Sequence, residues 1–274
     1  MLLALNVNNT NTVIALYTLQ SDGLTGDLRA TWRISTRQGQ TADEYGILIR
    51  SLLQNEGVET SDIRGIVIAS VVPPIDWILR QFCERTFSHK PLFIEPGVKT
   101  GLPILTDNPA EVGADRVANC VGAFHKYGGP TIVVDFGTAT NFDVVSRKGE
   151  FLGGAIAPGL NVSAEALFAR AARLPRVEIR RPAKIIGTNT VDNLQIGLFW
   201  GHIGLVDSIL ERMIAELGAE TKCIATGGLA HLIARESKYI SEVNERLTLE
   251  GLRLIYDRNR AARTSAEPSR TAGV

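Results

Sequence analysis

The feature that most constrains the fold of this chain is an internal repeat with a period of about 129 residues. Residues 4–16, ALNVNNTNTVIAL, align without a gap with residues 133–145, VVDFGTATNFDVV. Each copy runs from an apolar strand through a cluster of hydroxyl and amide side chains into a second strand, which is the pattern of a β-hairpin. Two such copies predict two similarly built domains, although two unrelated hairpins would also fit the pattern.

Short apolar runs and helical periodicity surround both copies. Thr41 and Glu44 have the spacing of a helix capping box, and the amphipathic segment that follows them ends near Gly57. Another helix pattern covers 110–126, and Pro73-Pro74 closes a buried strand. The remaining pattern predicts strands at 2–7, 12–17, 29–35, 65–72 and 222–225, a hairpin at 131–145, and helical segments near 163–173, 190–197, 203–217, 228–236 and 248–259. This mixture predicts an α/β fold.

Composition limits the classes of function. The 274 residues include 29 Lys plus Arg and 29 Asp plus Glu, so no net charge attracts nucleic acid or an anionic membrane. Three widely spaced cysteines, Cys83, Cys120 and Cys223, fit neither a disulfide framework nor a zinc site. The N-terminus lacks a basic region, and no apolar run approaches the ~20 residues of a membrane span. We therefore expect a soluble cytoplasmic protein that binds neither nucleic acid nor a membrane.

The second copy of the repeat contains the segment 135–140, DFGTAT, which suits phosphate binding. A tight turn rich in Gly and Thr presents N–H groups and hydroxyls to a phosphate, and we expect Gly137 to allow positive φ and close approach. Thr138 and Thr140 supply donors, and the carboxylate of Asp135 can hold a cation beside the phosphate. The motif is weak alone, and its pairing with a matching hairpin strengthens the prediction.

Charged side chains gather at 107–116, DNPAEVGADR, where a helix pattern begins. Asn108 or Asp107 could simply cap that helix, and Asp115 and Arg116 could form a solvated pair. The functional alternative is that Asp115 accepts a proton from a hydroxyl while Arg116 binds a carboxylate or phosphate.

Two glycine-containing segments could bring backbone amides to a ligand. The segment 153–159, GGAIAPG, is either a strand exit and turn or a contact for a small ligand. Thr226-Gly227-Gly228 follows a strand and is expected to open a helix whose N–H groups form the floor of a nucleotide site. The four histidines lack the spacing of a metal site or a catalytic triad, so we expect them at the surface or in the core: His89, His125, His202 and His231.

Together these segments resemble the type III pantothenate kinase family over roughly residues 1–258. The resemblance is carried by 1–13, 32–36, 70–73, 107–116, 125–130, 135–143, 153–159, 174–177, 186–190, 199–201, 225–228 and 247–252. It implies an α/β, duplicated two-domain fold of the actin-like or acetate-kinase-like (ribonuclease H-like) type. We place the N-terminal actin-like kinase domain at 1–117 and the C-terminal one at 118–260. The tail, 261–274, has the composition of a disordered segment.

The resemblance also implies an activity, the transfer of the γ-phosphate of ATP to pantothenate. The product is 4'-phosphopantothenate, and the reaction is the first step of coenzyme A biosynthesis. The resemblance further implies a homodimer that uses Mg²⁺ with ATP and a monovalent cation, K⁺ or NH₄⁺. Asp115 is then the general base, and Asp135 binds the monovalent cation. The implied pantothenate contacts are Gly113, Ala114, Asp115, Arg116 and, across the dimer interface, Thr190; the implied ATP contacts are Asn6, Val7, Asn8, Asn9, Thr10, Asn11, Thr12, Val13, Thr138, Gly227 and Gly228.

The first hairpin departs from the family pattern, Asp-x-Gly-Asn-Thr. It reads NVNNT from residue 6, so Asn6 replaces an aspartate and Asn8 replaces a glycine. Asn6 keeps the shape and one carbonyl acceptor but loses the charge that helps to hold Mg²⁺ on the phosphates. Asn8 tolerates left-handed φ, but its side chain projects towards the phosphate. The alternative to a working kinase is therefore a catalytically impaired relative that binds pantothenate or acts as a regulator.

Overall fold

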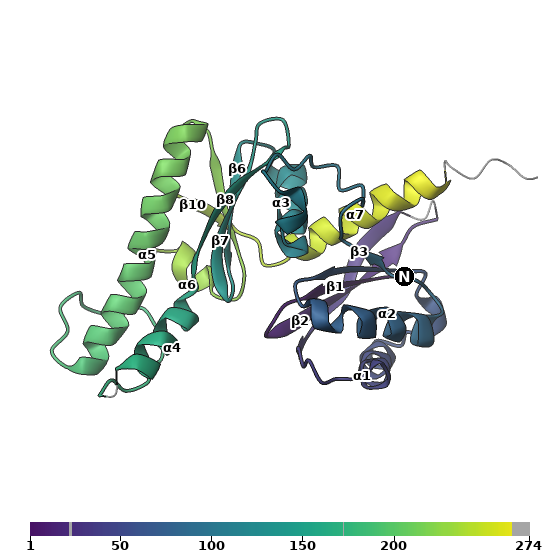
Figure 1. Cartoon of the computed structure of the whole chain (residues 1–274), viewed down its shortest axis with the longest axis horizontal. Helices are drawn as coiled ribbons and strands as arrows, with labels where there is room; N and C mark the ends of the chain where they lie inside the picture. The colour runs from purple at the N-terminus through teal and green to yellow at the C-terminus, as the bar shows by residue number, and fades with distance from the viewer. Residues whose placement is uncertain (22–23, 172, 265–274) are drawn as a thin grey trace, which may run out of the picture. The chain divides into compact units, whose positions relative to one another are not determined.

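The computed structural model describes residues 1–21, 24–171 and 173–264. The chain forms two compact units. The first contains residues 1–101, 108–122 and 248 onward, and the second contains 102–107 and 123–247. The elements of both units are labelled in Figure 1. Within the described ranges, every helix is too short or too polar to span a bilayer.

The first unit is built on a five-stranded sheet in the order β3-β2-β1-β4-β5. Its strands are β1 (Leu2–Val7), β2 (Asn11–Leu19), β3 (Thr25–Ser35), β4 (Gly65–Ser70) and β5 (Leu92–Phe93). The first three are antiparallel neighbours, whereas β1, β4 and β5 run parallel. Helices α1 (Ala42–Asn55) and α2 (Pro73–Phe87) lie on the same side of the sheet in Figure 1, and a short 3₁₀ turn covers Thr60–Asp62. Apolar side chains of the sheet, including Leu5 and Ile68, form one core cluster with side chains of these helices such as Tyr45 and Phe82.

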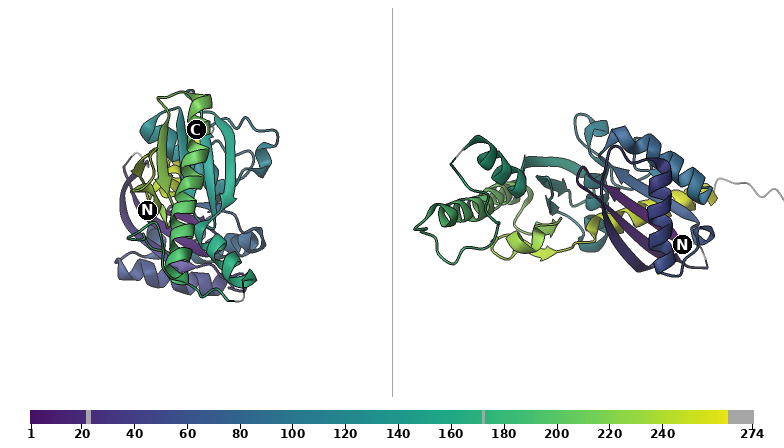
Figure 2. Two further views of the ribbon diagram at one scale, coloured as in Figure 1. Left: turned by 90° about the vertical axis from the view of Figure 1, so that its left-hand side faces the viewer. Right: turned by 90° about the horizontal axis from the view of Figure 1, so that it is seen from below.

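The second unit repeats this plan. Its strands are β6 (Thr131–Phe136), β7 (Ala139–Val145), β8 (Phe151–Pro158), β9 (Lys222–Thr226) and β10 (Ile240–Val243). The order β8-β7-β6-β9-β10 and the directions of the strands match those of the first sheet. Its helices are α4 (Leu160–Arg170), α5 (Thr190–Leu217) and α6 (Ala230–Ala234). Figure 2 shows α5 running across one face of this sheet, where it contributes Phe199 and Leu210 to the second core. The repeat therefore reflects a duplicated topology.

One long helix follows the last strand of each sheet. A 3₁₀ turn (Pro109–Glu111) leads into α3 (Ala114–Tyr127), and α7 (Leu247–Thr264) closes the described chain. Most of α7 groups with the first unit, so that unit differs from the predicted division at residue 117. Gly251 of α7 packs on the backbone of Ala118 in α3, where a side chain would collide.

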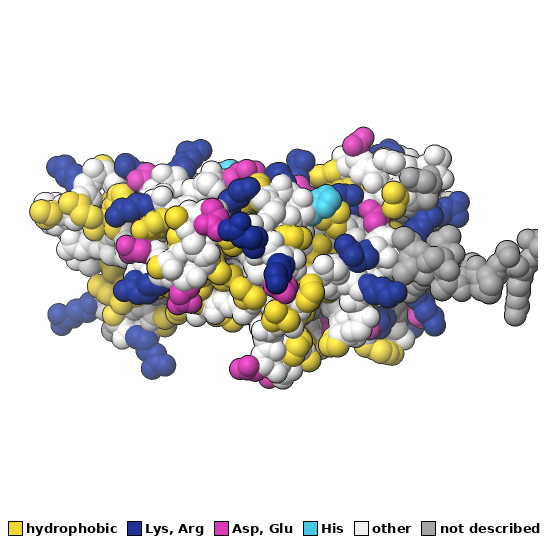
Figure 3. Space-filling model, turned by 90° about the horizontal axis from the view of Figure 1, so that it is seen from above, with side chains coloured by type: hydrophobic (Ala, Val, Ile, Leu, Met, Phe, Trp, Pro, Cys, Tyr) yellow, Lys and Arg dark blue, Asp and Glu magenta, His cyan; other side chains and the backbone are white. Residues whose placement is uncertain are grey.

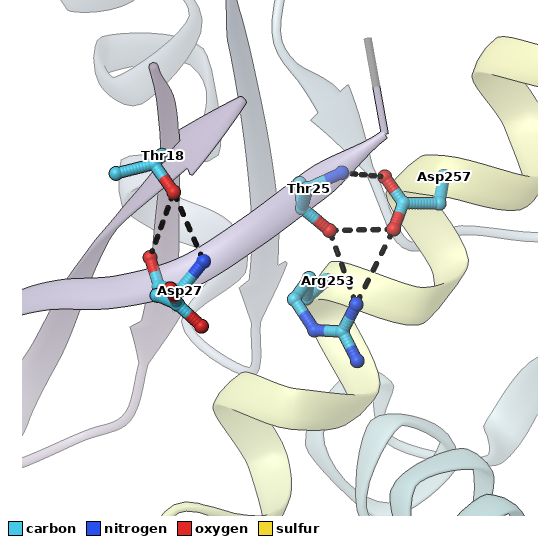
Figure 4. Close-up of polar contacts among 5 residues, drawn as sticks. All are labelled: Thr18, Thr25, Asp27, Arg253 and Asp257. Carbon is cyan, nitrogen blue, oxygen red and sulfur yellow. Dashed lines mark hydrogen bonds and ion pairs between the residues drawn. The ribbon is translucent and has the colours of Figure 1, made fainter. Parts of the chain in front are cut away.

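A polar cluster fastens α7 to the first sheet (Figure 4). The backbone N–H of Thr25 donates to Asp257 Oδ1 at 3.2 Å, and its hydroxyl donates to Asp257 Oδ2 at 2.5 Å. Arg253 donates to the same hydroxyl at 3.2 Å. Thr25 and Asp257 are 232 positions apart in the sequence, so this contact holds the C-terminal helix on the N-terminal sheet.

Several predicted elements are confirmed. The N–H of Glu44 donates to Thr41 Oγ1 at 3.3 Å, and the N–H of Thr41 donates to Glu44 Oε2 at 2.7 Å, so α1 begins with a complete capping box. The predicted strands at 2–7, 12–17, 29–35 and 222–225 all appear, with longer bounds for three of them. The side chains of Cys83, Cys120 and Cys223 are buried.

Other predictions about elements were wrong. The strand at 65–72 ends at Ser70, because a helix that the sequence analysis missed, α2, begins at Pro73. The segments 190–197 and 203–217 are one helix, α5. The first four residues of the predicted tail, 261–264, are helical, and residues 265–274 lie outside the described part.

Candidate functional site

The first hairpin joins β1 to β2 through Asn8, Asn9 and Thr10. The N–H of Asn8 donates to the carbonyl of Asn11 at 3.1 Å and closes the turn. Asn9 and Thr10 are exposed, whereas β1 is buried along its whole length. Asn8 does not have the left-handed φ that would favour glycine, so its presence costs the turn no backbone strain. The sequence therefore forms a rigid base under a solvent-facing turn of amide and hydroxyl groups.

Asn6 is the polar residue at the base of this turn. Its side chain is only 8% exposed, and its Oδ1 has no hydrogen-bond partner among the described residues. The register places Asn6 opposite Val13 of β2 and Ala69 of β4, which offer apolar side chains. A buried acceptor without a partner is costly, so this oxygen is suited to a water or a ligand group.

The second hairpin joins β6 to β7 through Gly137 and Thr138. Its last strand pair is Phe136 with Thr140, so its turn is one residue shorter than that of the first hairpin, which closes on Val7 and Thr12. The N–H of Gly137 donates to the carbonyl of Ala139 at 3.0 Å. Gly137 does not use the positive φ that glycine permits. Gly137 and Thr138 are exposed, as a phosphate contact requires.

Asp135 lies at the base of the second hairpin and is half-buried. It pairs with Asn141 of β7 and with Thr226 of β9, so oxygen-bearing side chains flank it in both neighbouring strands. Oxygen donors of this kind suit a hard cation. This position is equivalent to that of Asn6 in the first hairpin.

Gly227 packs directly against Asp135. A Cβ at Gly227 would lie 2.5 Å from Asp135 Oδ1 and 2.7 Å from the backbone N of Phe136, and its φ is +93°. Only glycine combines that φ with so close an approach. The helix expected at Thr226-Gly227-Gly228 begins later, at Ala230, and α6 spans only five residues. Gly227 therefore shapes the Asp135 site, and the helix expected to open at 226–228 opens instead at Ala230.

The segment 153–159 is mainly the edge strand β8. Its last residue, Gly159, donates its N–H to the carbonyl of Thr138 at 3.2 Å. A Cβ on Gly159 would lie 2.7 Å from the carbonyl oxygen of Gly137 and still closer to that of Thr138. The predicted strand and turn is present, and Gly159 at its end packs directly against the second hairpin.

Asp115 stands in the first turn of α3. Asn108 caps the preceding 3₁₀ turn, because its Oδ1 accepts from the N–H of Ala110 at 3.3 Å. Asp115 Oδ1 accepts from the backbone N–H of Arg116 at 2.8 Å. Burial raises the pKa of Asp115, while that hydrogen bond and the charge of Arg116 oppose the rise. A carboxylate with a raised pKa is a candidate proton acceptor.

The first unit brings the Asp115 segment close to the first hairpin. The N–H of Val71 donates to the carbonyl of Val7 at 3.0 Å. A Cβ on Gly113 would lie 3.6 Å from Val71 Cγ1 and 2.8 Å from Asp115 Oδ1. In the second unit, Asp135, Thr138 and Gly227 gather in the same way at one end of the sheet. Thr190 comes from elsewhere in that unit, where it is the exposed first residue of α5.

A buried polar contact beneath the second hairpin was not predicted from the sequence. Thr140 Oγ1 and His202 Nε2 are 3.1 Å apart, and both side chains are buried. His202 was expected in the core or at the surface, and its position in the core is confirmed. Its only sequence signal is one polar residue on the apolar face of a helix, which does not reveal its partner.

Comparison with known proteins identifies the family. The family described as type III pantothenate kinase matches residues 2–212. The type III pantothenate kinase of Acidobacterium capsulatum is 78% identical over 272 residues, which cover 99% of this chain and 100% of that protein. The enzyme of the same name from Koribacter versatilis is 58% identical over 265 residues, covering 95% and 97% of the two chains.

Solved structures support the fold. A putative Baf family transcriptional activator from Campylobacter jejuni superposes with a TM-score of 0.57 at 18% identity, covering 94% of this chain and 99% of that one. An activator of 2-hydroxyisocaproyl-CoA dehydratase from Clostridium difficile has a TM-score of 0.54 at 14% identity, covering 99% of both chains. The fold is the α/β, duplicated two-domain fold of the actin-like type. With a family match over most of its length and relatives this similar, the chain belongs to the type III pantothenate kinase family.

Proposed function

We propose that this protein is an ATP-dependent pantothenate kinase that produces 4'-phosphopantothenate, the first intermediate of coenzyme A biosynthesis. The observation that carries the proposal is the near full-length identity of 78% to a type III pantothenate kinase. The duplicated hairpins add a physical reason, because each has an exposed turn with a threonine hydroxyl, Thr10 or Thr138, that suits phosphate binding.

Asp115 is the proposed general base. Its carboxylate takes the proton from the primary hydroxyl of pantothenate as that oxygen attacks the γ-phosphorus of ATP. The bond from the γ-phosphorus to the bridging oxygen breaks, and ADP leaves. Arg116 binds the pantothenate carboxylate, together with the backbone of Gly113 and Ala114. The half-buried position of Asp115 and the upward shift of its pKa support this role.

The two hairpins are the proposed ATP contacts. In the first unit these are the residues from Asn6 to Val13, and in the second they are Thr138, Gly227 and Gly228. The exposed residues of each turn position the phosphates, which is the main requirement of phosphoryl transfer: Asn9 and Thr10 in the first hairpin, Gly137 and Thr138 in the second. The buried strands beneath the turns make this positioning rigid.

The cations implied by the family fit the side chains at the base of each hairpin. Asp135 and its polar neighbours, Asn141 and Thr226, suit a monovalent cation, K⁺ or NH₄⁺. The unpartnered Oδ1 of Asn6 suits Mg²⁺ held on the ATP phosphates, directly or through water. When bound, these cations neutralise charge on the phosphates.

A homodimer is the proposed assembly, in which Thr190 contacts pantothenate of the neighbouring subunit. The exposed apolar side chains near Thr190 support an interface there: Ile185 is 64% exposed, Ile186 is 79% exposed, and Val191 is 42% exposed. We also propose a cytoplasmic protein that binds no nucleic acid or membrane. Its balanced charge supports this, and both signs occur across the face in Figure 3.

The catalytically impaired alternative rests on Asn6 and Asn8 alone, and the comparisons do not favour it. A thermal-shift titration separates the two functions, because a ligand that binds the folded state raises Tm. Pantothenate and Mg-ATP should each raise the Tm of a working kinase. A rise with pantothenate and none with Mg-ATP would instead support a pantothenate-binding protein.

A further inference from the structure

Each hairpin closes on a buried threonine. Thr12 pairs with Val7 in the first hairpin, and Thr140 pairs with Phe136 in the second. Both side chains are almost fully buried, at 0% and 1% exposed. A buried hydroxyl needs a hydrogen-bond partner, so each of these threonines links its turn to another element.

The two hairpins use different partners. Thr12 Oγ1 lies 2.9 Å from the hydroxyl of Thr36, which follows β3. Thr140 Oγ1 lies 3.1 Å from Nε2 of His202, which belongs to α5. The two units therefore share a device, a hydrogen bond that holds the hairpin from beneath. In the second unit the partner is an imidazole on a long helix.

His202 is buried beside the ring of Phe136. Its side chain is 6% exposed, and its ring lies 6.1 Å from the ring of Phe136, centroid to centroid. Burial lowers the pKa of His202, and no charged group contributes to the shift. The imidazole is therefore neutral at pH 7 and shares a neutral hydrogen bond with Thr140.

We propose that His202 is a positioning residue for the second phosphate hairpin, which it holds through the hydroxyl of Thr140. This inference rests on the proposed function, in which Thr138, two residues before Thr140, contacts ATP. The turn itself is exposed and is closed by one backbone hydrogen bond from Gly137 to Ala139. A donor that contributes to phosphoryl transfer must be fixed to within a fraction of an ångström, so a buried link at the base of the turn matters.

The test compares His202→Leu and Thr140→Val with the native enzyme in ATP-dependent pantothenate phosphorylation. Each variant should raise KM for ATP about 3- to 10-fold, the effect of one lost hydrogen bond, with KM for pantothenate unchanged. The double variant should add nothing to either single one, because both remove the same bond. His202→Gln should restore KM for ATP, because its side-chain amide can replace the Nε2 contact.

Ser237→Ala is the matched control. It removes a 2.6 Å hydrogen bond from the hydroxyl of Ser237 to Asp207, which is also on α5, so it tests for a merely structural effect. The proposal is overturned if His202→Leu raises KM for ATP no more than this control does, or if the effects of His202→Leu and Thr140→Val add. If His202→Leu does not fold, Thr140→Val and His202→Gln decide in the same way.

Binding of the non-hydrolysable analogue AMP-PNP, measured by calorimetry, separates this inference from the proposed function. If the native protein binds AMP-PNP but does not phosphorylate pantothenate, the proposed function is overturned and the positioning role of His202 is not. In that case a 3- to 10-fold rise in Kd for AMP-PNP in His202→Leu, reversed in His202→Gln, still supports the positioning role. A native enzyme that binds no AMP-PNP would overturn both.

Discussion

Asn6 and Asp135 occupy equivalent positions at the base of the two hairpins, and only Asp135 carries a charge. The neighbours of Asn6 in the adjoining strands, Val13 and Ala69, are apolar, whereas those of Asp135 are polar. The duplicated fold therefore presents a neutral hairpin in one unit and a charged, oxygen-rich one in the other. We infer that cation binding by protein carboxylates is concentrated in the second unit.

Replacing Asp135 by Asn should weaken the monovalent cation site. The loss of the carboxylate removes the strongest ligand, so the K⁺ concentration for half-maximal activity should rise more than about tenfold. Kinetic titrations with K⁺ at saturating Mg-ATP measure this. An unchanged K⁺ dependence in this variant would mean that the monovalent cation does not bind at Asp135.

Replacing Asp115 by Asn should lower kcat by about 10²- to 10⁴-fold and leave both KM values within a factor of a few. The proposed general base acts as a carboxylate, and burial raises the pKa of Asp115. Activity should therefore fall as the pH decreases through the raised pKa of Asp115, which lies above the ordinary aspartate pKa of 3.8. The control is Asp107→Asn, an exposed carboxylate in the same segment, which should retain native kcat. An equal loss of kcat in both variants would show that Asp115 is not the general base.

Gly227 and Gly228 form a matched pair for a test of packing. Gly227→Ala introduces a Cβ 2.5 Å from Asp135 Oδ1 at a φ of +93°, and should destabilise the protein by about 1–3 kcal/mol. Gly228→Ala meets nothing within 4 Å and has no positive φ, so its Tm should change little. Thermal unfolding of the two variants checks this. Similar Tm values would mean that the turn can move away from Asp135.

The buried imidazole of His202 predicts a pH dependence of stability. Its pKa is lowered in the folded state, so below the ordinary value of 6.5 the unfolded chain binds the proton more readily. Stability should be unaffected by this group above that pH and should fall as the pH decreases below it, until the lowered folded-state pKa is reached. Urea unfolding at pH 7.5 and 5.5 should show a smaller change for His202→Gln. An equal change in both proteins would exclude His202 as the source.

The duplicated fold could be predicted because its signals are local. The repeat of strand, polar turn and strand is visible without a gap, and the capping box of Thr41 and Glu44 fixes the start of α1. Helix α2 was missed because Pro73-Pro74 was interpreted only as the end of a strand. Proline is also common in the first turn of a helix, and α2 begins at Pro73. Helix α5 was predicted as two parts because Gly201 interrupts the helical sequence pattern. The helix itself continues through Gly201.

The contacts that could not be predicted join residues far apart in the chain. Thr25 binds Asp257, and Thr140 binds His202. In each case the sequence shows an isolated polar residue, and only the packing of elements identifies its partner. The same holds for Gly227, whose importance comes from the proximity of Asp135 rather than from the expected helix.

The most direct test of the kinase assignment is ATP-dependent formation of 4'-phosphopantothenate with Mg²⁺ and K⁺ present. The native protein would be measured beside the double variant Asn6→Asp/Asn8→Gly, which restores the family pattern in the first hairpin. The account predicts that the native protein turns over at a rate near that of the double variant, since Asn6 keeps an available oxygen and Asn8 is unstrained. Turnover by the double variant alone would contradict it and identify the native chain as a kinase relative inactivated at its first hairpin.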